Sequence, residues 1–232
     1  MRRRRALGFV VALSLSATAG GLISASAASL NGANPAKIGG WVYPQTIAAP
    51  TVLAWTNFTG TTGTNLNGHA LNAGGTWTAD LGTWTIQTNT AGASNTALAN
   101  IDLNVGTQNA AAVATLTIGA TANSGLVVND NGTVALYALY SKAAGGTLTL
   151  YKYSGGATVL GTATGVGTAA TGTLKVDSTT TTIKVSWNGT VLISYPLTPA
   201  EVTTFHGATN NRFGLIADGD SVTRFDDFHA DQ

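Results

Sequence analysis

Residues 211–230 read NRFGLIADGDSVTRFDDFHA, and the fold that we expect for the chain rests mainly on this segment. The pattern predicts two strands joined by a turn, because successive side chains of a strand point to opposite faces. One face of the first strand carries alternate residues, Phe213, Leu215 and Ala217. Val222, Phe225 and Phe228 supply the apolar side of the second strand. The change of face between the two phenylalanines predicts a bulge or bend at Asp226-Asp227.

From Thr51 onward the chain repeats this pattern of short strand-like runs, separated by turns rich in Gly, Asn and Asp. Asn188-Gly189 and Asp130-Asn131-Gly132 each predict a hairpin. Thr198 as N-cap and Pro199 at the first helical position predict one helical turn. Many short strands with a single helical turn predict an all-β fold, a two-sheet antiparallel β-sandwich.

The N-terminus has the composition of an export signal. Arg2–Arg5 form a positively charged start, Ala6–Leu15 is apolar, and Ala25-Ser26-Ala27 fits a cleavage site. The apolar run is too short for a transmembrane helix, which needs about 20 apolar residues. We therefore expect a protein that is secreted or held at the cell surface. Its expected parts are a signal peptide at 1–27, an extended lead-in at 28–50 and the sandwich domain at 51–232.

The charge balance changes when such a signal is removed. The chain has 11 Lys and Arg residues against 10 Asp and Glu residues, and cleavage removes four arginines, which leaves a net charge of −3. A mildly acidic surface offers no attraction to nucleic acid or to an anionic membrane. The chain has no cysteine, so disulfides cannot stabilise it. Only 9% of its residues are charged, so its solubility must rest on Thr, Asn and Ser. Some secreted β proteins share this composition, and so do self-associating proteins.

Four short motifs follow one another along the chain. Residues 55–66 read WTNFTGTTGTNL, 74–78 read GGTWT, 212–215 read RFGL, and 225–228 read FDDF. In this order the motifs resemble the concanavalin A-like (laminin-G-like) jelly-roll domains of secreted bacterial and phage proteins. The resemblance covers roughly 51–230 and implies two stacked antiparallel sheets with the first and last strands adjacent. Because that family includes lectins, adhesion modules and glucanases, the resemblance does not decide the function.

The residues that glycoside hydrolysis requires are missing from the sequence. Retaining glycosidases need two carboxylates about 5 Å apart. The resemblance implies that a glucanase of this type would carry two Glu and one Asp on one strand. This chain has one glutamate, Glu201, in the predicted helical turn. The three histidines, His69, His206 and His229, are far apart and fit turn or surface positions better than a metal cluster. No serine, zinc or cysteine catalytic motif appears, so we predict that the protein is not an enzyme.

Calcium is the one ion that the sequence suggests. The resemblance implies Ca²⁺ bound by carboxylates and carbonyls in loops, and hard cations prefer oxygen ligands. Asp218 and Asp220 flank Gly219, and Asp130 lies in a predicted hairpin turn, so these three aspartates are the candidate ligands. The alternative is that they only form turns, which Asp favours without any ion.

Aromatic residues are the candidates for binding sugar rings. Tyr137, Tyr151 and Tyr153 alternate away from the leucines of their strands, which predicts one sheet surface lined by tyrosine with Lys152 nearby. The alternative is that these tyrosines pack between the sheets. Trp41 and Tyr43 in the lead-in are a second candidate pair.

Three functions therefore stay open. The first is a secreted, non-catalytic module that binds a polysaccharide or another cell-surface ligand, based on the export signal and the missing catalytic residues. The second is a structural or self-associating surface protein, such as a coat, filament or phage-tail component, based on the low charge. The third is a polysaccharide hydrolase with an unusual site.

Overall fold

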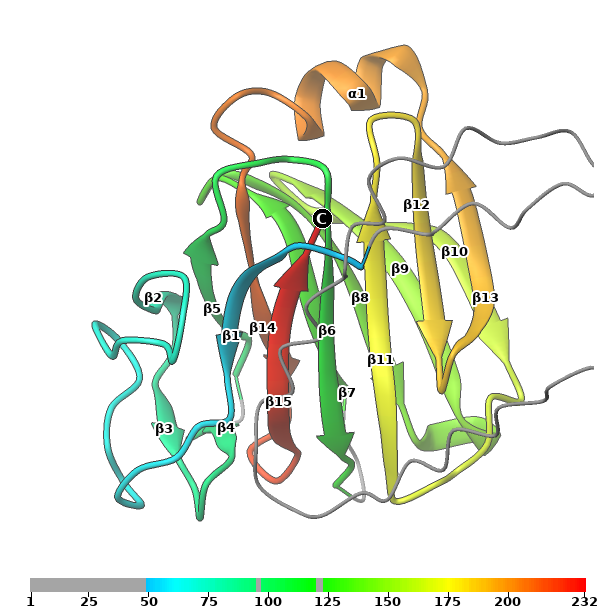
Figure 1. The fold of residues 1–232 in the computed structure, drawn as a ribbon. Coiled ribbons are helices and arrows are strands. Elements are labelled where there is room, and N and C mark those ends of the chain that lie inside the picture. Colours follow the sequence, from blue (N-terminus) through cyan, green and yellow to red (C-terminus); the bar gives the residue numbers. More distant parts are fainter. Residues whose placement is uncertain (1–48, 95–96, 120–122) are drawn as a thin grey trace, which may run out of the picture. The chain divides into compact units, whose positions relative to one another are not determined.

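The computed structural model describes residues 49–94, 97–119 and 123–232, and it consists of two antiparallel sheets packed face to face (Figure 1). The predicted two-sheet antiparallel sandwich is therefore confirmed. The predicted signal peptide and nearly all of the lead-in lie outside the described residues. Within them, no helix is long and apolar enough to cross a membrane.

The first sheet contains both the first and the last strand of the described chain. Its order is β13 (Thr190–Pro196), β12 (Thr182–Trp187), β11 (Thr171–Ser178), β6 (Ala110–Thr117), β15 (Arg224–Asp231), β4 (Ala91–Ala93) and β3 (Trp84–Ile86). β1 (Val52–Thr56) also pairs with β15. The adjacency of the first and last strands, which the family resemblance implied, is thus present.

The second sheet lies behind the first in Figure 1. Its order is β10 (Ala157–Thr164), β9 (Thr147–Ser154), β8 (Val134–Ser141), β7 (Asn123–Asp130), β14 (Arg212–Asp218), β5 (Ala99–Asn104) and β2 (Thr78–Leu81). The short helix α1 (Pro199–Phe205) lies at one end of the sandwich, and a 3₁₀ turn spans Ala143–Gly145.

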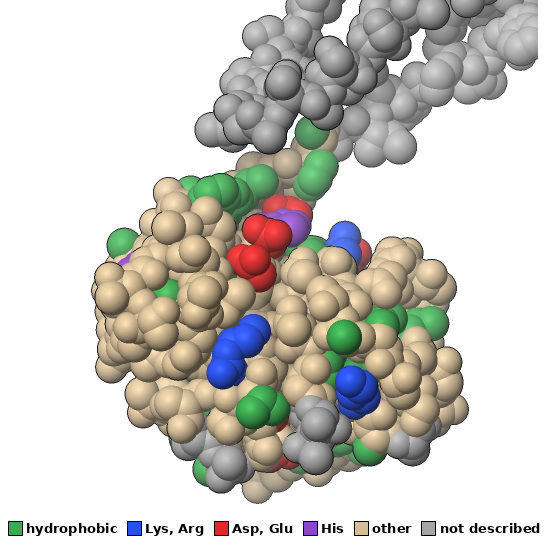
Figure 2. Space-filling model, turned by 90° about the horizontal axis from the view of Figure 1, so that it is seen from below, with side chains coloured by type: hydrophobic (Ala, Val, Ile, Leu, Met, Phe, Trp, Pro, Cys, Tyr) green, Lys and Arg blue, Asp and Glu red, His purple; other side chains and the backbone are tan. Residues whose placement is uncertain are grey.

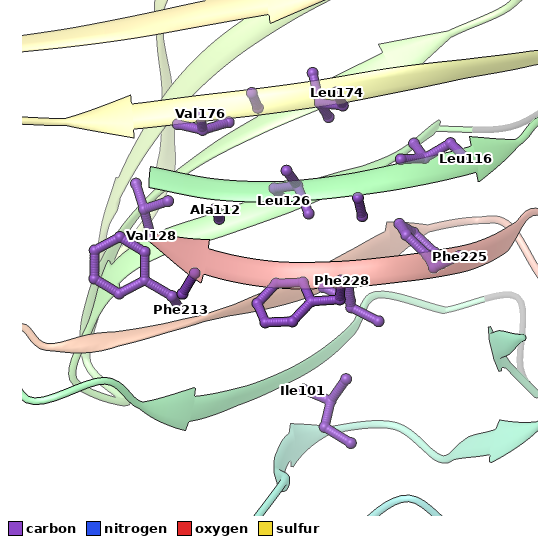
Figure 3. Packing of buried hydrophobic residues seen from close by; sticks show 14 of the residues in the cluster. Ile101, Ala112, Leu116, Leu126, Val128, Leu174, Val176, Phe213, Phe225 and Phe228 are labelled. Atoms are coloured by element: carbon purple, nitrogen blue, oxygen red, sulfur yellow. The ribbon is translucent and has the colours of Figure 1, made fainter. Parts of the chain in front are cut away.

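The hydrophobic core fills the space between the sheets (Figure 3). Strand alternation supplies it from both sides, so Leu126 and Val128 of the second sheet face Leu174 and Val176 of the first. All four side chains are fully buried. Each such side chain contributes roughly 1.5–3 kcal/mol when it leaves water, which makes this double layer the main source of stability.

The C-terminal stretch forms two strands, as predicted, but they belong to different sheets. β14 pairs with β5 and β7, whereas β15 pairs with β6, β1 and β4. The turn between them therefore carries the chain across the core. The predicted bulge is present, because the register shifts between Asp226 and His229 and Asp227 has φ 49°. This bulge lets both Phe225 and Phe228 point into the core.

The prediction for Val222 was wrong. Its side chain is 54% exposed, and β15 begins only at Arg224. The reason is local: the Val222 and Thr223 N–H groups both donate to Asp220 Oδ1, at 2.9 Å each, so this segment is a turn held by an aspartate.

The predicted turns and the helix are present. Asn188 (φ 49°) and Gly189 (φ 80°) join β12 to β13, as a type I′ hairpin requires. Thr198 caps α1: its Oγ1 accepts the Glu201 N–H at 3.3 Å, while a Glu201 carboxylate oxygen accepts the Thr198 N–H at 3.0 Å. This reciprocal pair is a capping box.

Candidate functional site

The three tyrosines lie on the outer face of the second sheet, away from the sandwich core. Tyr137 of β8 pairs with Tyr151 of β9, and the two rings stack with centroids 5.0 Å apart and planes 14° apart. Tyr153 follows on the same strand and face and is 40% exposed. These tyrosines do not pack between the sheets, because Leu136 and Leu150 occupy the core face of their strands.

Lys152 does not share this face. Strand alternation turns it the other way, and its Nζ forms an ion pair with Glu201 of α1 at 2.8 Å. The expected lysine beside the tyrosines is therefore absent.

Apolar side chains surround the tyrosines and form a second, smaller buried cluster. Its members are Val127, Ala135, Tyr137, Leu139 and Ile216, with Tyr151 packed against them. A pocket of about 240 Å³ opens on this face. Tyr137 and Tyr153 line one part of the pocket, and Asp80, Asn100 and Asp130 line another. The pocket therefore combines aromatic and apolar surface with polar oxygen atoms, which is the usual make-up of a small-molecule site.

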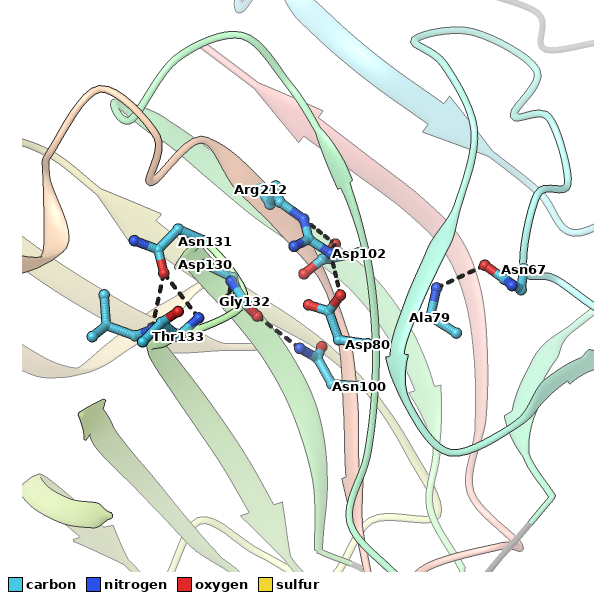
Figure 4. A network of polar contacts seen from close by, with 11 residues as sticks. Asn67, Ala79, Asp80, Asn100, Asp102, Asp130, Asn131, Gly132, Thr133 and Arg212 are labelled. Carbon is cyan, nitrogen blue, oxygen red and sulfur yellow. Dashed lines mark hydrogen bonds and ion pairs between the residues drawn. The ribbon is translucent and has the colours of Figure 1, made fainter. Parts of the chain in front are cut away.

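The polar part of the pocket wall, together with the charged residues bonded to it, comes from four strands that sequence reading did not connect. Alternation along β5 sends Ala99, Ile101 and Leu103 into the core, so Asn100 and Asp102 point to the outer face. Asp80 comes from β2, Asp130 ends β7 and Arg212 begins β14. Figure 4 shows the Arg212 guanidinium between Asp80 and Asp102.

Short charge-assisted bonds hold this cluster together. Arg212 Nη2 lies 2.6 Å from Asp80 Oδ1 and 2.5 Å from Asp102 Oδ1, and Arg212 Nε donates to the same Asp102 oxygen at 2.7 Å. Asn100 Nδ2 donates to Asp130 Oδ2 at 2.7 Å, and the Gly132 N–H donates to Asp130 Oδ1 at 2.6 Å. Two carboxylates, those of Asp80 and Asp102, thus share one guanidinium, while the third, Asp130, is held by an amide and a backbone N–H.

Asp102 is the least satisfied carboxyl group of the cluster. Its side chain is fully buried, and its Oδ2 accepts no hydrogen bond from any described residue. Burial and the neighbouring Asp130 charge raise the pKa of Asp102 to about 9, and the Arg212 ion pair only partly opposes them. For Arg212, burial works to lower the pKa, but its bonds to Asp80 and Asp102 outweigh that effect and raise it. Burial is thus the main reason why the Asp102 carboxyl holds its proton more tightly than an exposed aspartate does.

The tyrosine end of the pocket stays neutral. Burial raises the pKa of Tyr137 to about 12, with smaller contributions from Tyr151 and Asp218. Its phenol is therefore a hydrogen-bond donor throughout the physiological pH range.

The structure does not bring the three predicted calcium ligands together. Asp130 pairs with Arg212 at one end of β14, whereas Asp218 pairs with Asn123 at the other. Asp220 is buried, and both of its oxygens accept protein donors: Ser124 Oγ at 2.6 Å on Oδ2, and two turn N–H groups on Oδ1. Asp130 lies instead with Asp80 and Asp102.

Trp41 and Tyr43 lie outside the described residues. Another aromatic residue, Trp55 of β1, is 40% exposed on the first sheet, and sequence reading did not single it out as a binding residue. It also missed Asp80, Asn100, Asp102 and Arg212 as site residues. The only local signal was the alternation in residues 99–104, ANIDLN, where every second side chain is polar.

The strand order of the two sheets defines the class of fold: this chain is a jelly-roll β-sandwich. It is similar to a carbohydrate-binding module, CBM66, from Bacillus subtilis, with a TM-score of 0.53 and 14% identity over 67% of this chain and 95% of that one. It is also similar to a structure from work on endo-acting O-glycanases that human gut microbiota express to initiate mucin breakdown, with a TM-score of 0.52, 6% identity, and 78% and 99% of the chains covered. No family model and no curated protein matches the chain.

Proposed function

We propose that this protein is a non-catalytic module that binds glycans in the pocket on the outer face of its second sheet. The observation that carries the proposal is the juxtaposition of Tyr137 and Tyr153 with the oxygens of Asp80, Asn100 and Asp130 around one cavity. A sugar ring has an apolar C–H face that packs on a tyrosine ring, and its hydroxyls donate to carboxylate and amide oxygens. The similarity in fold to a carbohydrate-binding module supports this proposal.

The charge of the pocket favours one class of glycan. Its polar lining includes Asp80 and Asp130, while Arg212 is already engaged by Asp80 and Asp102. Acceptors therefore outnumber free donors, and an anionic sugar would meet like charge. We infer that the ligand is a neutral, hydroxyl-rich polysaccharide.

A ligand of this kind fits the predicted location. The export signal expected at residues 1–27 would place the module outside the cell, where polysaccharides are found. We propose further that the module is of the laminin-G-like type found in secreted bacterial and phage proteins.

Calorimetry on the purified protein with neutral and anionic polysaccharides tests the proposal. We expect saturable binding to a neutral one, weakened at least about fivefold by Tyr153→Ala, the factor that about 1 kcal/mol represents. Trp55→Ala is the matched control, because Trp55 and Tyr153 are equally exposed, at 40%. No binding to any polysaccharide would contradict the function, and a loss confined to Trp55→Ala would place the site on the first sheet.

Polysaccharide hydrolysis is the less favoured function for the same pocket. The three carboxylates are close enough for acid–base chemistry, but Asp102 is fully buried with Arg212 on its Oδ1, and both Asp130 oxygens accept internal donors. A bound sugar would therefore meet no free acid–base pair. The reducing ends released from each polysaccharide in the binding panel provide the check, and we expect none above the protein-free control.

Self-association is the remaining alternative, and exposed apolar side chains support it. Val159 of β10 and Val191 of β13 are 55% and 52% exposed on the outer strands of the two sheets. The pairing of β10 with β9 shifts in register between Val159 and Gly161. The pairing of β13 with β12 shifts opposite Val185 and Ser186 of β12. Such bulges hinder the addition of a further strand, so they oppose assembly through these two edges. A mass that rises with concentration in light scattering would favour assembly over the binding module.

A further inference from the structure

We infer that Asp80, Asp102 and Asp130 form a binding site for a divalent cation, with Ca²⁺ as the expected ion. One carboxylate oxygen from each residue lies within 4.8 Å of the others. Three carboxylates at this spacing from three different strands match the all-oxygen coordination that hard cations require. The inference goes beyond the proposed function, because it does not depend on any glycan.

An independent observation points to a ligand at this place. Asn100 is 8% exposed, and its Oδ1 is buried without a hydrogen-bond partner among the described residues. Its Nδ2 donates to Asp130 Oδ2, and Figure 4 shows this bond with Asp80 drawn next to the Asn100 amide. The amide oxygen therefore lies beside the carboxylate cluster without a donor of its own. A buried polar atom left unpaired destabilises the fold, and a cation coordinated by Oδ1 would remove this cost.

Asp102 offers a second unpaired oxygen. Arg212 bonds only its Oδ1, and its Oδ2 is buried without a partner in the described part of the chain. The sheet thus presents two oxygens, from Asn100 and Asp102, that no described protein donor uses. Both come from the same face of β5, two residues apart, so they lie on one side of the cluster.

Charge supports the same conclusion. An ion bound to the three aspartates displaces the proton from Asp102, and the ionised carboxylates then exceed the single positive charge of Arg212 by two negative charges. A divalent cation compensates both, whereas a monovalent ion compensates one. Asp80 and Asn100 line the pocket, so the cation has a route from solvent, and water can complete its coordination.

The irregular arrangement favours Ca²⁺ over Mg²⁺. Arg212 already occupies one side of Asp80 and Asp102, so the remaining oxygens do not surround a point evenly. Calcium accepts six to eight oxygens in flexible geometry, while magnesium demands a near-ideal octahedron. The Asp218 turn lacks these features, because none of the unpaired buried oxygens among the described residues belongs to Asp218 or Asp220.

Calcium titration of the EDTA-treated protein, followed by calorimetry and by thermal unfolding without any glycan, tests the inference. We expect one saturable Ca²⁺ site per chain and a Tm that rises by several degrees at about 100 times the Kd. Magnesium at the same concentration should bind at least about tenfold more weakly. Absence of saturable binding at millimolar Ca²⁺ would overturn the inference, whatever the glycan experiments show.

Two substitutions locate the site. Asp80→Asn keeps the side-chain shape at a surface position and should lower Ca²⁺ affinity at least about tenfold, whereas Asp218→Asn, at the opposite end of β14, should leave it unchanged. Asn100→Ala removes the unpaired oxygen without changing any charge and should also weaken binding. The reverse pattern, with loss only in Asp218→Asn, would move the ion to the turn and overturn the assignment to this cluster.

Discussion

At the scale of single residues, the polar cluster depends on the absence of a side chain at Gly214. This residue lies in β14 opposite Asp102 of β5 and Val127 of β7. A Cβ atom built there would lie 2.1 Å from the Ile101 carbonyl oxygen and 2.5 Å from Asp102 Cα. Both atoms belong to the backbone, which has no room to move within the sheet. Glycine therefore allows β14 and β5 to approach closely enough for Arg212 and Asp102 to meet.

Replacement of Gly214 should damage both the fold and the pocket. We expect Gly214→Ala to lower the free energy of unfolding by about 1–3 kcal/mol, as overpacking usually does. Gly156→Ala is the matched control, because a Cβ at Gly156 meets nothing within 4 Å, and its effect should stay within about 0.5 kcal/mol. Urea unfolding of the two variants makes the measurement, and equal stabilities would show that the sheet absorbs the extra atom.

At the scale of elements, Glu201 attaches helix α1 to the two sheets. Its carboxylate accepts hydrogen bonds from Thr198 of the helix cap, Lys152 of β9 and Tyr195 of β13. Burial by itself would raise the pKa of Glu201, but the bond from Lys152 and those from Thr198 and Tyr195 outweigh it and lower the pKa to about 2. The sole glutamate of the chain is thus a structural residue.

This pKa sets a pH dependence with a definite sign. Because the folded-state pKa lies below the ordinary value of 4.5, the stabilising contribution is complete above about pH 4.5 and is lost as the pH falls towards about 2. We expect the wild-type protein to lose more unfolding free energy between pH 5 and pH 2 than Glu201→Gln does. Urea unfolding across that range provides the test, and parallel pH profiles would contradict the assignment.

At the scale of the whole molecule, β15 holds the first sheet together. It lies between β6 on one side and β1 and β4 on the other, so it joins the last strand of the chain to the first. Phe228 anchors it in the core, fully buried, with its ring 5.0 Å from that of Trp77. Figure 2 shows the contrast outside, where uncharged polar side chains and backbone cover most of the visible face.

Loss of the Phe228 ring should therefore affect the whole fold. We expect Phe228→Ala to cost about 3–5 kcal/mol of unfolding free energy, the range for a buried phenylalanine. Val222→Ala, six residues earlier and 54% exposed, should change it by less than about 0.5 kcal/mol. Thermal and urea unfolding compare the two, and a similar cost for both would mean that Val222 packs in solution.

Local chemistry was sufficient to predict much of this architecture from the sequence. Period-two alternation identified the strands, Asn188-Gly189 selected its hairpin turn, and Thr198 with Pro199 marked the only α-helix among the described residues. The change of face between Phe225 and Phe228 required a bulge. Each of these inferences depends on residues within one element, where sterics and hydrogen bonding act over a few positions.

Only the tertiary structure decided which strands are neighbours. The turn after β14 was visible in the sequence, but its passage from one sheet to the other was not. The same holds for the candidate site. Arg212 meets Asp102 across 110 positions and Asp80 across 132. Alternation predicted which face of its strand each side chain takes. The pairing of distant strands, which burial of the whole core sets, brought these charged groups into one cluster beside the pocket.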